Sequence, residues 1–448
     1  MDGGILTALG GTGMFLFGMA VMTEALRSAA GGSLRRILAR FTATPLRGAR
    51  TGAAATAAVQ SSSAVTVMTL GFVGAGLMTF PQSLGVLYGA NVGTTATGWI
   101  VTLVGIKLDM ARLALPLLFV AALAAALGPP AVRRAGQAGA GLALLFLGIG
   151  FMQDGMAGAG GLITPERLPG DTGAGRVQLI LIGTAAAAVL QSSSAGMAVT
   201  LVLLGAGAIS FAQAAAIVVG LNIGTCVTGL IAVLGGTRPA LQAAVANVLF
   251  NVISALAVLP LLGPVGRMAA GADPQTALVV FHTGLNVVGV ALFLPVTGAF
   301  ARLVTRLVPD RPEAAALGPA LDPALLAGPD AALDGAQAVA AAVADAALPA
   351  VATEARGGAG AAGRPARPGA ALDGLQAVLA RLAVPQGAAR TLARYTALLH
   401  QMDHTARLID RAARASALDP VARDPVLRRA ATALAAAAER AVAPGADP

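Results

Sequence analysis

The pentapeptide Gln-Ser-Ser-Ser-Ala occurs twice in this chain, at Gln60–Ala64 and at Gln191–Ala195, and each copy lies inside a long apolar stretch. Stretches of about 20 apolar residues are long enough to cross a lipid bilayer as helices. A run of hydroxyl groups at that depth has no water to bond to, and each unpaired polar group there is costly. The two runs therefore have to meet one another, face a cavity or hold a ligand.

The two pentapeptides belong to a longer internal repeat. Gln60 and Gln191 are 131 residues apart (191 − 60). The asparagines of Gly-Ala-Asn-Val-Gly-Thr and Gly-Leu-Asn-Ile-Gly-Thr, Asn91 and Asn222, have the same separation (222 − 91). The repeat covers about residues 10–262. Matching polar interruptions in two halves of an apolar chain are the pattern of a secondary transporter.

The composition indicates an integral membrane protein rather than a soluble enzyme. Hydrophobic residues make up 56% of the chain, charged residues 11%, and the mean hydropathy is +0.77. The net charge of +9 comes from arginines that flank the apolar segments or lie in the C-terminal tail, so membrane topology explains it better than nucleic-acid binding. Cys226 is the only cysteine, which excludes a disulfide within the chain.

The arginines also predict the direction of the segments. The first apolar segment, Ile5–Leu26, is followed by an arginine cluster over Arg27–Arg50, which should be cytoplasmic by the positive-inside rule. The first segment of the second half, Leu142–Met156, instead follows Arg133 and Arg134 and should run outward. We therefore predict an all-α, polytopic protein of the inner membrane, embedded in the lipid bilayer as two inverted repeats, with a cytoplasmic C-terminus.

Four parts are expected along the chain. Residues 1–134 form membrane repeat 1, and residues 135–310 form membrane repeat 2 with a final transmembrane helix at Thr276–Leu307. Residues 311–370 are an Ala/Gly/Pro-rich linker with some helix, and residues 371–448 form a small cytoplasmic helical bundle, because apolar residues recur there at helical spacing. We interpret the two serine runs as breaks in helices, at the tips of re-entrant or discontinuous segments.

The polar residues at membrane depth do not form an enzyme's catalytic set. His282 is the only histidine of the membrane region, and the acids Glu24, Asp109 and Asp154 lie near segment ends, where we expect boundary residues. The remaining groups are neutral. Serine hydroxyls after a helix break can donate to an oxyanion, and helix N-termini favour anions. An anion without buried Arg or Lys needs cations, and neutral oxygens suit Na⁺.

Simpler explanations stay open for each motif. Ser and Thr in membrane helices often bond the carbonyl four residues back or mediate helix packing. The Asn-x-Gly-Thr elements could serve glycine-mediated packing alone, and His282 with Asn286 could be a satisfied core pair.

These motifs resemble the type II sodium–phosphate cotransporter family over about residues 1–310. The mark of that family is a duplicated Gln-Ser-Ser-Ser motif in inverted repeats, each followed by an Asn-x-Gly-Thr-Thr element. The elements stand at Asn91–Thr95 and at Asn222–Thr225, where Cys226 replaces the second threonine. Two later elements, Asn247–Asn251 and His282–Asn286, are similar to the His-x-x-Phe-Asn elements of bacterial members.

The resemblance implies roles for particular residues. The serines of both runs are expected to coordinate phosphate: Ser61, Ser62, Ser63, Ser192, Ser193 and Ser194. Sodium binding or shaping of the site is expected of seven further residues: Gln60, Gln191, Asn91, Thr94, Thr95, Asn222 and Thr225. No metal other than sodium is implied.

The implied function is sodium-coupled transport of inorganic phosphate by alternating access, without enzymatic activity. Export of phosphate and transport of another oxyanion are the nearest alternatives, and a membrane-anchored regulator signalling through its tail is the alternative of another class. The tail over Arg390–Arg414 is similar to the PhoU domain of bacterial members, although an unrelated helical tail stays open. A homodimer is compatible with the sequence.

Overall fold

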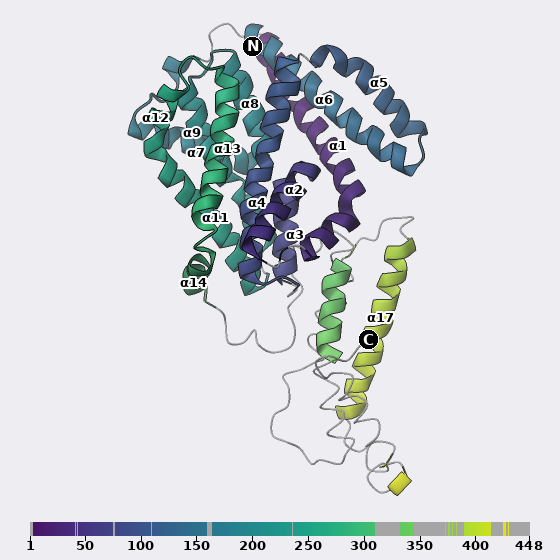
Figure 1. Cartoon of the computed structure of the whole chain (residues 1–448). Helices are drawn as coiled ribbons and strands as arrows, with labels where there is room; N and C mark the ends of the chain where they lie inside the picture. Colours follow the sequence, from purple (N-terminus) through teal and green to yellow (C-terminus); the bar gives the residue numbers. More distant parts are fainter. Residues whose placement is uncertain are drawn as a thin grey trace. The chain divides into compact units, whose positions relative to one another are not determined.

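The computed structural model describes residues 3–309 except 41, 43, 75–76, 109, 159–163 and 235, and then residues 332–344, 372, 375–376, 379, 382, 389–413, 424–426 and 429. All regular elements in these residues are helices, as predicted (Figure 1). They fall into two compact units. The larger unit comprises residues 1–69, 80–232 and 242–304, and the smaller unit comprises residues 70–79, 233–241 and 305–448.

The helices follow one another in this order: α1 (Gly3–Arg40), α2 (Pro45–Val59), α3 (Ser62–Gly74), α4 (Phe80–Trp99), the π-helix η1 (Ile100–Lys107), α5 (Ala111–Leu127), α6 (Pro130–Gly158), the 3-10 helix η2 (Pro165–Arg167), α7 (Gly173–Leu190), α8 (Ser193–Gly205), α9 (Phe211–Gly224), α10 (Cys226–Ala232), α11 (Arg238–Val258), the 3-10 helix η3 (Leu259–Leu261), α12 (Leu262–Met268), α13 (Pro274–Phe293), α14 (Thr297–Leu307) and α17 (Ala389–Ala413).

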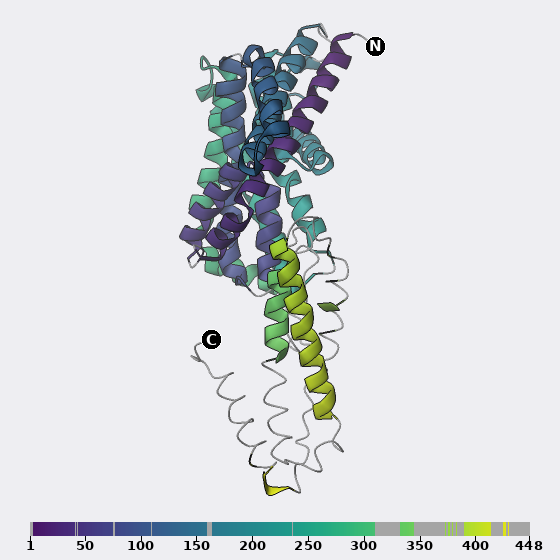
Figure 2. The same ribbon diagram turned by 90° about the vertical axis from the view of Figure 1, so that its right-hand side faces the viewer.

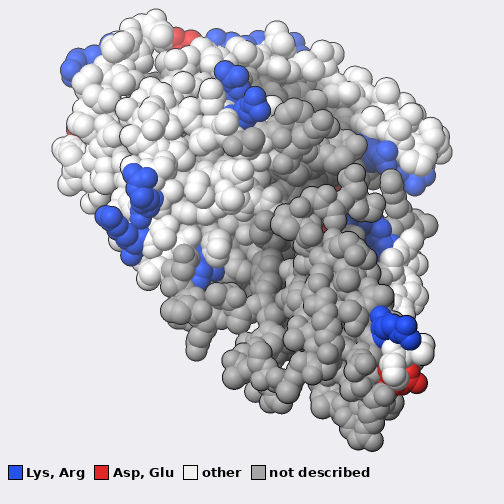
Figure 3. Space-filling model, turned by 60° about the horizontal axis from the view of Figure 1, so that its bottom comes forward, with Lys and Arg blue, Asp and Glu red and all other residues white. Residues whose placement is uncertain are grey.

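Several of these helices are long and apolar enough to cross a bilayer. Among the described residues, six pass this test by length and composition. Helix α4 with η1 passes it together with α5, bent by 115° at the break between them, and counting this pair as one span brings the number to seven. Their outward faces are apolar, as at Leu115, Phe119 and Leu127 of α5. Figure 2 shows most of the long helices running along a common direction. On the face drawn in Figure 3, uncharged residues cover most of the described surface. The chain is therefore a multi-pass membrane protein.

Helices α1 and α6, the first helix of each half, pack against each other in opposite directions. A Cβ atom added at Gly11 would lie 2.7 Å from the Gly148 carbonyl oxygen, and one added at Gly148 would lie 2.7 Å from the Gly11 oxygen. Gly18 and Gly141 show the same reciprocal contact at 2.6 Å. As the number rises in α1 it falls in α6, so the helices are antiparallel. Only glycine allows backbones to come this close.

Helix α2 lies parallel to α4, which makes α2 and α3 a hairpin. Gly48 of α2 contacts Val86 of α4, and Thr56, two turns further along α2, contacts Gly93. The chain leaves α2 at Val59 and must reverse before α4 begins, so that α4 can start beside the start of α2. Helix α3 makes that return. The hairpin's tip is the first serine run, where the predicted helix break is present.

The second half builds the same hairpin from α7 and α8, with α9 beside α7. An added Cβ at Gly224 of α9 would lie 2.8 Å from the Ala187 Cβ of α7, and one at Gly93 would lie 2.7 Å from the Thr56 Cβ. The two contacts are related by the same shift of 131 residues (224 − 93 and 187 − 56). The sequence repeat is thus a repeat of packing as well as of motifs.

The last membrane segment departs from the prediction. A single transmembrane helix over Thr276–Leu307 was expected, but α13 ends at Phe293 and a separate helix, α14, begins at Thr297. Pro295 lies between them and has no N–H with which to continue the helical hydrogen bonds. The expectation of one continuous helix was wrong, and the proline explains why.

The smaller unit has its own apolar core. Helix 332–344, inside the predicted linker, contributes Leu333 and Val343, which pack in one cluster with Leu375, Leu398 and Met402. An ion pair also joins Asp334 of this helix to Arg394 of α17. Part of the predicted linker therefore belongs to the helical bundle. Most of the rest of residues 311–370 and 371–448 lies outside the described residues, so the PhoU-like domain stays a prediction.

Candidate functional site

The tips of the two hairpins have the same backbone geometry. Gln60 and Gln191 are the only described residues other than glycine with positive φ, at 57° and 49°. This left-handed conformation ends the first helix of each hairpin and turns the chain. The next residue caps the second helix, because the Oγ of Ser61 accepts from Ala64 N–H and that of Ser192 accepts from Ala195 N–H, both at 3.2 Å.

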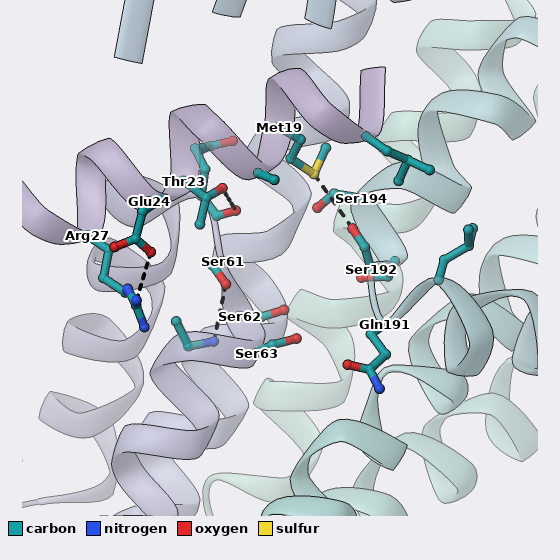
Figure 4. Close-up of a pocket in the computed structure, with 16 residues that line it drawn as sticks. Met19, Thr23, Glu24, Arg27, Ser61, Ser62, Ser63, Gln191, Ser192 and Ser194 are labelled. Atoms are coloured by element: carbon teal, nitrogen blue, oxygen red, sulfur yellow. Dashed lines mark hydrogen bonds and ion pairs between the residues drawn. The ribbon is translucent and has the colours of Figure 1, made fainter. Parts of the chain in front are cut away.

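Both serine runs line one cavity of about 360 Å³ in the larger unit (Figure 4). Water occupies about 30 Å³ per molecule in the liquid, so the space is large enough for a small ligand with water. Helix α1 forms the remaining wall. The lining residues are Leu16, Met19, Ala20, Thr23, Glu24, Arg27, Gln60, Ser61, Ser62, Ser63, Ala64, Leu190, Gln191, Ser192, Ser193 and Ser194.

Two helix N-termini begin at the cavity wall. Ser62 is the first residue of α3 and Ser193 the first residue of α8, and each helix is 13 residues long. The first N–H groups of a helix lack partners within it and carry a partial positive charge, which favours anions. Since both N-termini and both sets of hydroxyls meet at one cavity, the arrangement can donate hydrogen bonds to an oxyanion from two sides.

Thr97 of α4 connects the two runs. Its Oγ1 donates to the Gln60 Oε1 over 3.0 Å and accepts from the Ser194 Oγ over 3.2 Å. Gln60 also donates from Nε2 to the Ala57 carbonyl oxygen over 2.6 Å. Thr97 is 3% exposed, whereas Gln60 and Ser194 are half-buried and line the cavity. The first glutamine is therefore fixed from both ends of its amide.

Helix α1 contacts both hairpin tips. The Oγ1 of Thr23 lies 3.5 Å from the Gln60 carbonyl oxygen, and the Ser192 Oγ lies 3.6 Å from the Met19 sulfur. Met19 and Thr23 are one helical turn apart on α1, so one face of this helix runs across the opening between the tips. Glu24, the next residue, and Arg27, one turn beyond Thr23, also line the cavity.

The predicted Asn-x-Gly-Thr residues lie elsewhere. Asn91, Thr94, Thr95, Asn222 and Thr225 are absent from the cavity lining. The threonine hydroxyls bond backbone carbonyl oxygens of their own helices. The two asparagines bond residues of the later elements. The structure thus separates these five from the glutamines and serines, and their relation to sodium stays a prediction.

A second polar cluster surrounds those asparagines. Asn91 donates to the Asn247 Oδ1 over 3.4 Å, whereas Asn222 donates to the Asn286 Oδ1 over 3.2 Å and its own Oδ1 lies 3.0 Å from the His282 Nε2. Each repeat asparagine therefore pairs with one of the two later elements, α11 or α13. These contacts join the repeats to the helices that follow them.

Sequence reasoning did not assign a site role to Thr97, Met19, Glu24 or Arg27. Glu24 was expected to be a boundary residue, and the structure adds that it lines the cavity. The helical spacing of Leu16, Thr23 and Arg27 could have indicated that one face of α1 is involved. Nothing in the sequence distinguishes Thr97 from its repeat counterpart Thr228.

The fold and the site define a class of membrane protein with two repeated helical hairpins whose serine tips meet at one cavity. The chain matches the Na⁺/Pi-cotransporter family twice, over residues 14–154 and 166–306, and it belongs to that family. This is a family of transporters and not of enzymes. No solved structure gives a significant match.

Curated relatives agree with this membership. The chain is 32% identical over 301 residues to "Uncharacterized protein YqeW" of Bacillus subtilis, covering 66% of this chain and 95% of the relative. It is 29% identical over 328 residues to "Putative inorganic phosphate export protein YjbB" of Salmonella typhimurium, and 29% identical over 331 residues to the protein of that name in Escherichia coli. Each of these two matches covers 69% of this chain and 56% of the relative.

Proposed function

We propose that this protein transports inorganic phosphate together with sodium ions across the inner membrane. The observation that carries the proposal is that both Gln-Ser-Ser-Ser runs, separated by 131 residues (191 − 60), line one cavity. Phosphate is held between the hairpin tips by the hydroxyls of six serines: Ser61, Ser62, Ser63, Ser192, Ser193 and Ser194.

Sodium balances the charge of the bound phosphate. Around the serines the lining offers hydroxyl, amide and carbonyl oxygens, and Arg27 on α1 is its only Lys or Arg within the part of the chain that the structure describes. A phosphate dianion away from bulk water needs compensating positive charge. Neutral oxygens such as those of Gln60 and Gln191 suit Na⁺, and sodium entering with phosphate supplies the charge. Binding of both ions is then mutually dependent.

Transport proceeds by alternating access around the cavity. The antiparallel packing of α1 and α6 and the paired hairpins support an inverted repeat, which is the architecture that exchanges inward and outward openings. The charged side chains Glu24 and Arg27 lie at one side of the cavity, on the part of α1 that leads to the arginine cluster. By the positive-inside rule this side is cytoplasmic. Arg302, Arg306 and Arg311, which precede the tail, favour a cytoplasmic C-terminus by the same rule.

On the other side of the hairpin tips, contacts join the helices. The Lys107 Nζ at the end of η1 lies 3.3 Å from the Asp273 Oδ2, and the Gln275 Nε2 donates to the Leu201 carbonyl oxygen over 2.9 Å. Trp99 donates to the Thr283 Oγ1 over 3.0 Å. These contacts close the cavity on the outer side, whereas Glu24 and Arg27 border it on the cytoplasmic side. The arrangement supports an inward-facing state.

Export is the second candidate for the direction of net transport. It is favoured by the names of the relatives from Salmonella typhimurium and Escherichia coli, and this chain spans 56% of the length of each. Export and import share the cavity and the serine runs. They differ in which gradient drives the cycle.

Flux of radiolabelled phosphate in vesicles reconstituted with the purified full chain tests the proposal. An inward Na⁺ gradient should accelerate uptake, and a matched K⁺ gradient should not. Loading vesicles with phosphate and reversing the gradient measures export in the same preparation. Phosphate flux in neither direction refutes phosphate transport, and flux that is identical in Na⁺ and K⁺ refutes sodium coupling.

A further inference from the structure

Among the described residues that line the cavity, Glu24 and Arg27 are the only ones with charged side chains. The Arg27 Nη2 lies 2.7 Å from the Glu24 Oε2. Figure 4 shows this pair at one side of the cavity, with the serines of both runs beyond it. We infer that Arg27 is the first residue to bind phosphate on its way into the cavity. The Glu24 carboxylate stays paired with the Arg27 guanidinium until phosphate displaces it. The inference rests on the proposed phosphate transport.

The position of the pair on α1 places it in the path of a ligand. Met19 and Thr23 contact the two hairpin tips, and Arg27 follows Thr23 by one turn on the same face of the helix. A ligand moving along this face meets the guanidinium first and the serines next. The inner part of the described lining is neutral, so Arg27 supplies the positive charge nearest to the serines on that wall.

The exposure of the pair makes the exchange feasible. The Arg27 side chain is 41% exposed and the Glu24 side chain 65% exposed, so water screens their attraction. A phosphate dianion carries more charge than a carboxylate and offers oxygens that match the planar fork of a guanidinium. It can therefore compete for Arg27. A deeply buried pair would not exchange in this way.

Glu24 then lowers the affinity of Arg27 for anions at the entrance of the cavity. Its carboxylate resembles a phosphate oxygen pair in charge sign and geometry, so it keeps Arg27 from holding other anions tightly. It also weakens the hold on phosphate itself, which lets the ligand move on to the serines. The simpler reading is an ordinary surface pair between residues three apart on a helix, which would make no difference to phosphate.

A double-mutant cycle separates these two readings, because Glu24 is inferred to act only through Arg27. Isothermal titration of the purified full chain with inorganic phosphate, in sodium buffer, gives the Kd of each variant. We expect Arg27→Gln to raise the Kd about fivefold and Glu24→Gln to lower it about threefold. The double variant should bind as weakly as Arg27→Gln alone.

Two control variants match the changes in net charge. Arg302→Gln on α14 and Asp154→Asn on α6 lie outside the cavity lining, and both should leave the Kd unchanged. If net charge alone mattered, the controls would shift the Kd as much as the variants, and the double variant would return to the wild-type value. Either result overturns the inference, as does wild-type affinity in Arg27→Gln.

Folding and the proposed function are checked separately. Thermal unfolding of each variant reports folding, and Arg27→Lys, which keeps the charge, should recover part of the lost affinity. If Arg27→Gln does not fold, Glu24→Gln decides, since tighter binding supports the inference and unchanged binding overturns it. Absence of phosphate binding by the wild-type protein would refute the proposed function. This titration needs no variant, so it tests the proposed function separately from the role of Arg27.

Discussion

The two hairpins of this protein carry the same four-residue motif on the same backbone but differ in their neighbours. Gln60 and Gln191 both adopt the left-handed conformation, and Ser61 and Ser192 both cap the helix that follows. The identity of these tips shows that the motif itself determines the turn and the cap. Local hydrogen bonds within a few residues suffice for that.

The surroundings of the tips are not the same. The Gln60 amide bonds Ala57 and Thr97, while Gln191 is exposed and makes no side-chain hydrogen bond within the described residues. Ser193 is buried, at 5% exposure, whereas its counterpart Ser62 is half-buried. A repeated motif thus provides two similar tips, but the surrounding helices bind the glutamine amide at the first tip and bury Ser193 at the second.

Removing one serine hydroxyl from each tip tests whether both hold the ligand. Ser62→Ala and Ser193→Ala should each abolish phosphate flux, because each removes a hydrogen bond to a charged group worth about 1.5–3 kcal/mol, or roughly 10- to 150-fold in affinity. Radiolabelled phosphate flux in vesicles, at equal amounts of inserted protein, is the measurement. Ser83→Ala, outside the cavity, is the control. Wild-type flux in both variants would refute the site assignment.

The features that the two halves share could be read from the sequence. The repeat, the helix breaks at the serine runs and the all-α membrane fold follow from residues close together in the chain, because hydrophobic length and helix capping act locally. That the two runs meet at one cavity was a hypothesis from their polarity. Pro295, which separates α13 from α14, is a local signal of the same kind.

The features that distinguish the halves could not be read in this way. Thr97 and Thr228 occupy equivalent repeat positions, and only the three-dimensional packing of α4 against both tips brings Thr97 between Gln60 and Ser194. The role of Glu24 depends on which face of α1 crosses the cavity. Long-range contacts of this kind depend on the placement of whole helices and not on local sequence.

Equivalent glycines test the likeness of the halves. Gly93→Ala and Gly224→Ala should each lower the free energy of unfolding by about 1–3 kcal/mol, since the new Cβ would lie 2.5 Å from the Ala53 carbonyl oxygen in the first variant and closer still to the Thr184 carbonyl oxygen in the second. Thermal unfolding in detergent measures this. Gly284→Ala, also in a helix but with open space around its Cα, should be neutral or slightly stabilising. If only one of these two variants lost stability, the packing of α2 against α4 and that of α7 against α9 would not be equally tight.

The glutamines test the difference between the halves. Gln60→Gly and Gln191→Gly remove the amide without straining the left-handed backbone. Gln60→Gly should cost about 1–2 kcal/mol of stability, because two side-chain hydrogen bonds are lost, and Gln191→Gly should cost less than about 0.5 kcal/mol. Thermal unfolding ranks the two variants. Equal losses would mean that the second glutamine is tied as firmly as the first.

The last prediction concerns Thr97, which joins the two tips by hydrogen bonds. Thr97→Val keeps the side-chain volume but removes the hydroxyl that joins Gln60 to Ser194, which should cost about 1 kcal/mol and weaken phosphate binding about fivefold. Thr228→Val is the matched control, and its phosphate Kd should stay within about twofold of the wild-type value, because Thr228 has no bond to either tip in the described residues.

Combining Thr97→Val with Gln60→Gly shows whether the hydroxyl acts through the first glutamine. Residues in one hydrogen-bonded chain give non-additive effects, so the double variant should lose less phosphate affinity than the two single losses together. Titration with inorganic phosphate measures all three variants. Additive losses would mean that Thr97 positions Ser194 independently of Gln60. In that case Thr97 would act by orienting Ser194 of the second tip. The difference between the two tips would then originate at the second tip and not at the first.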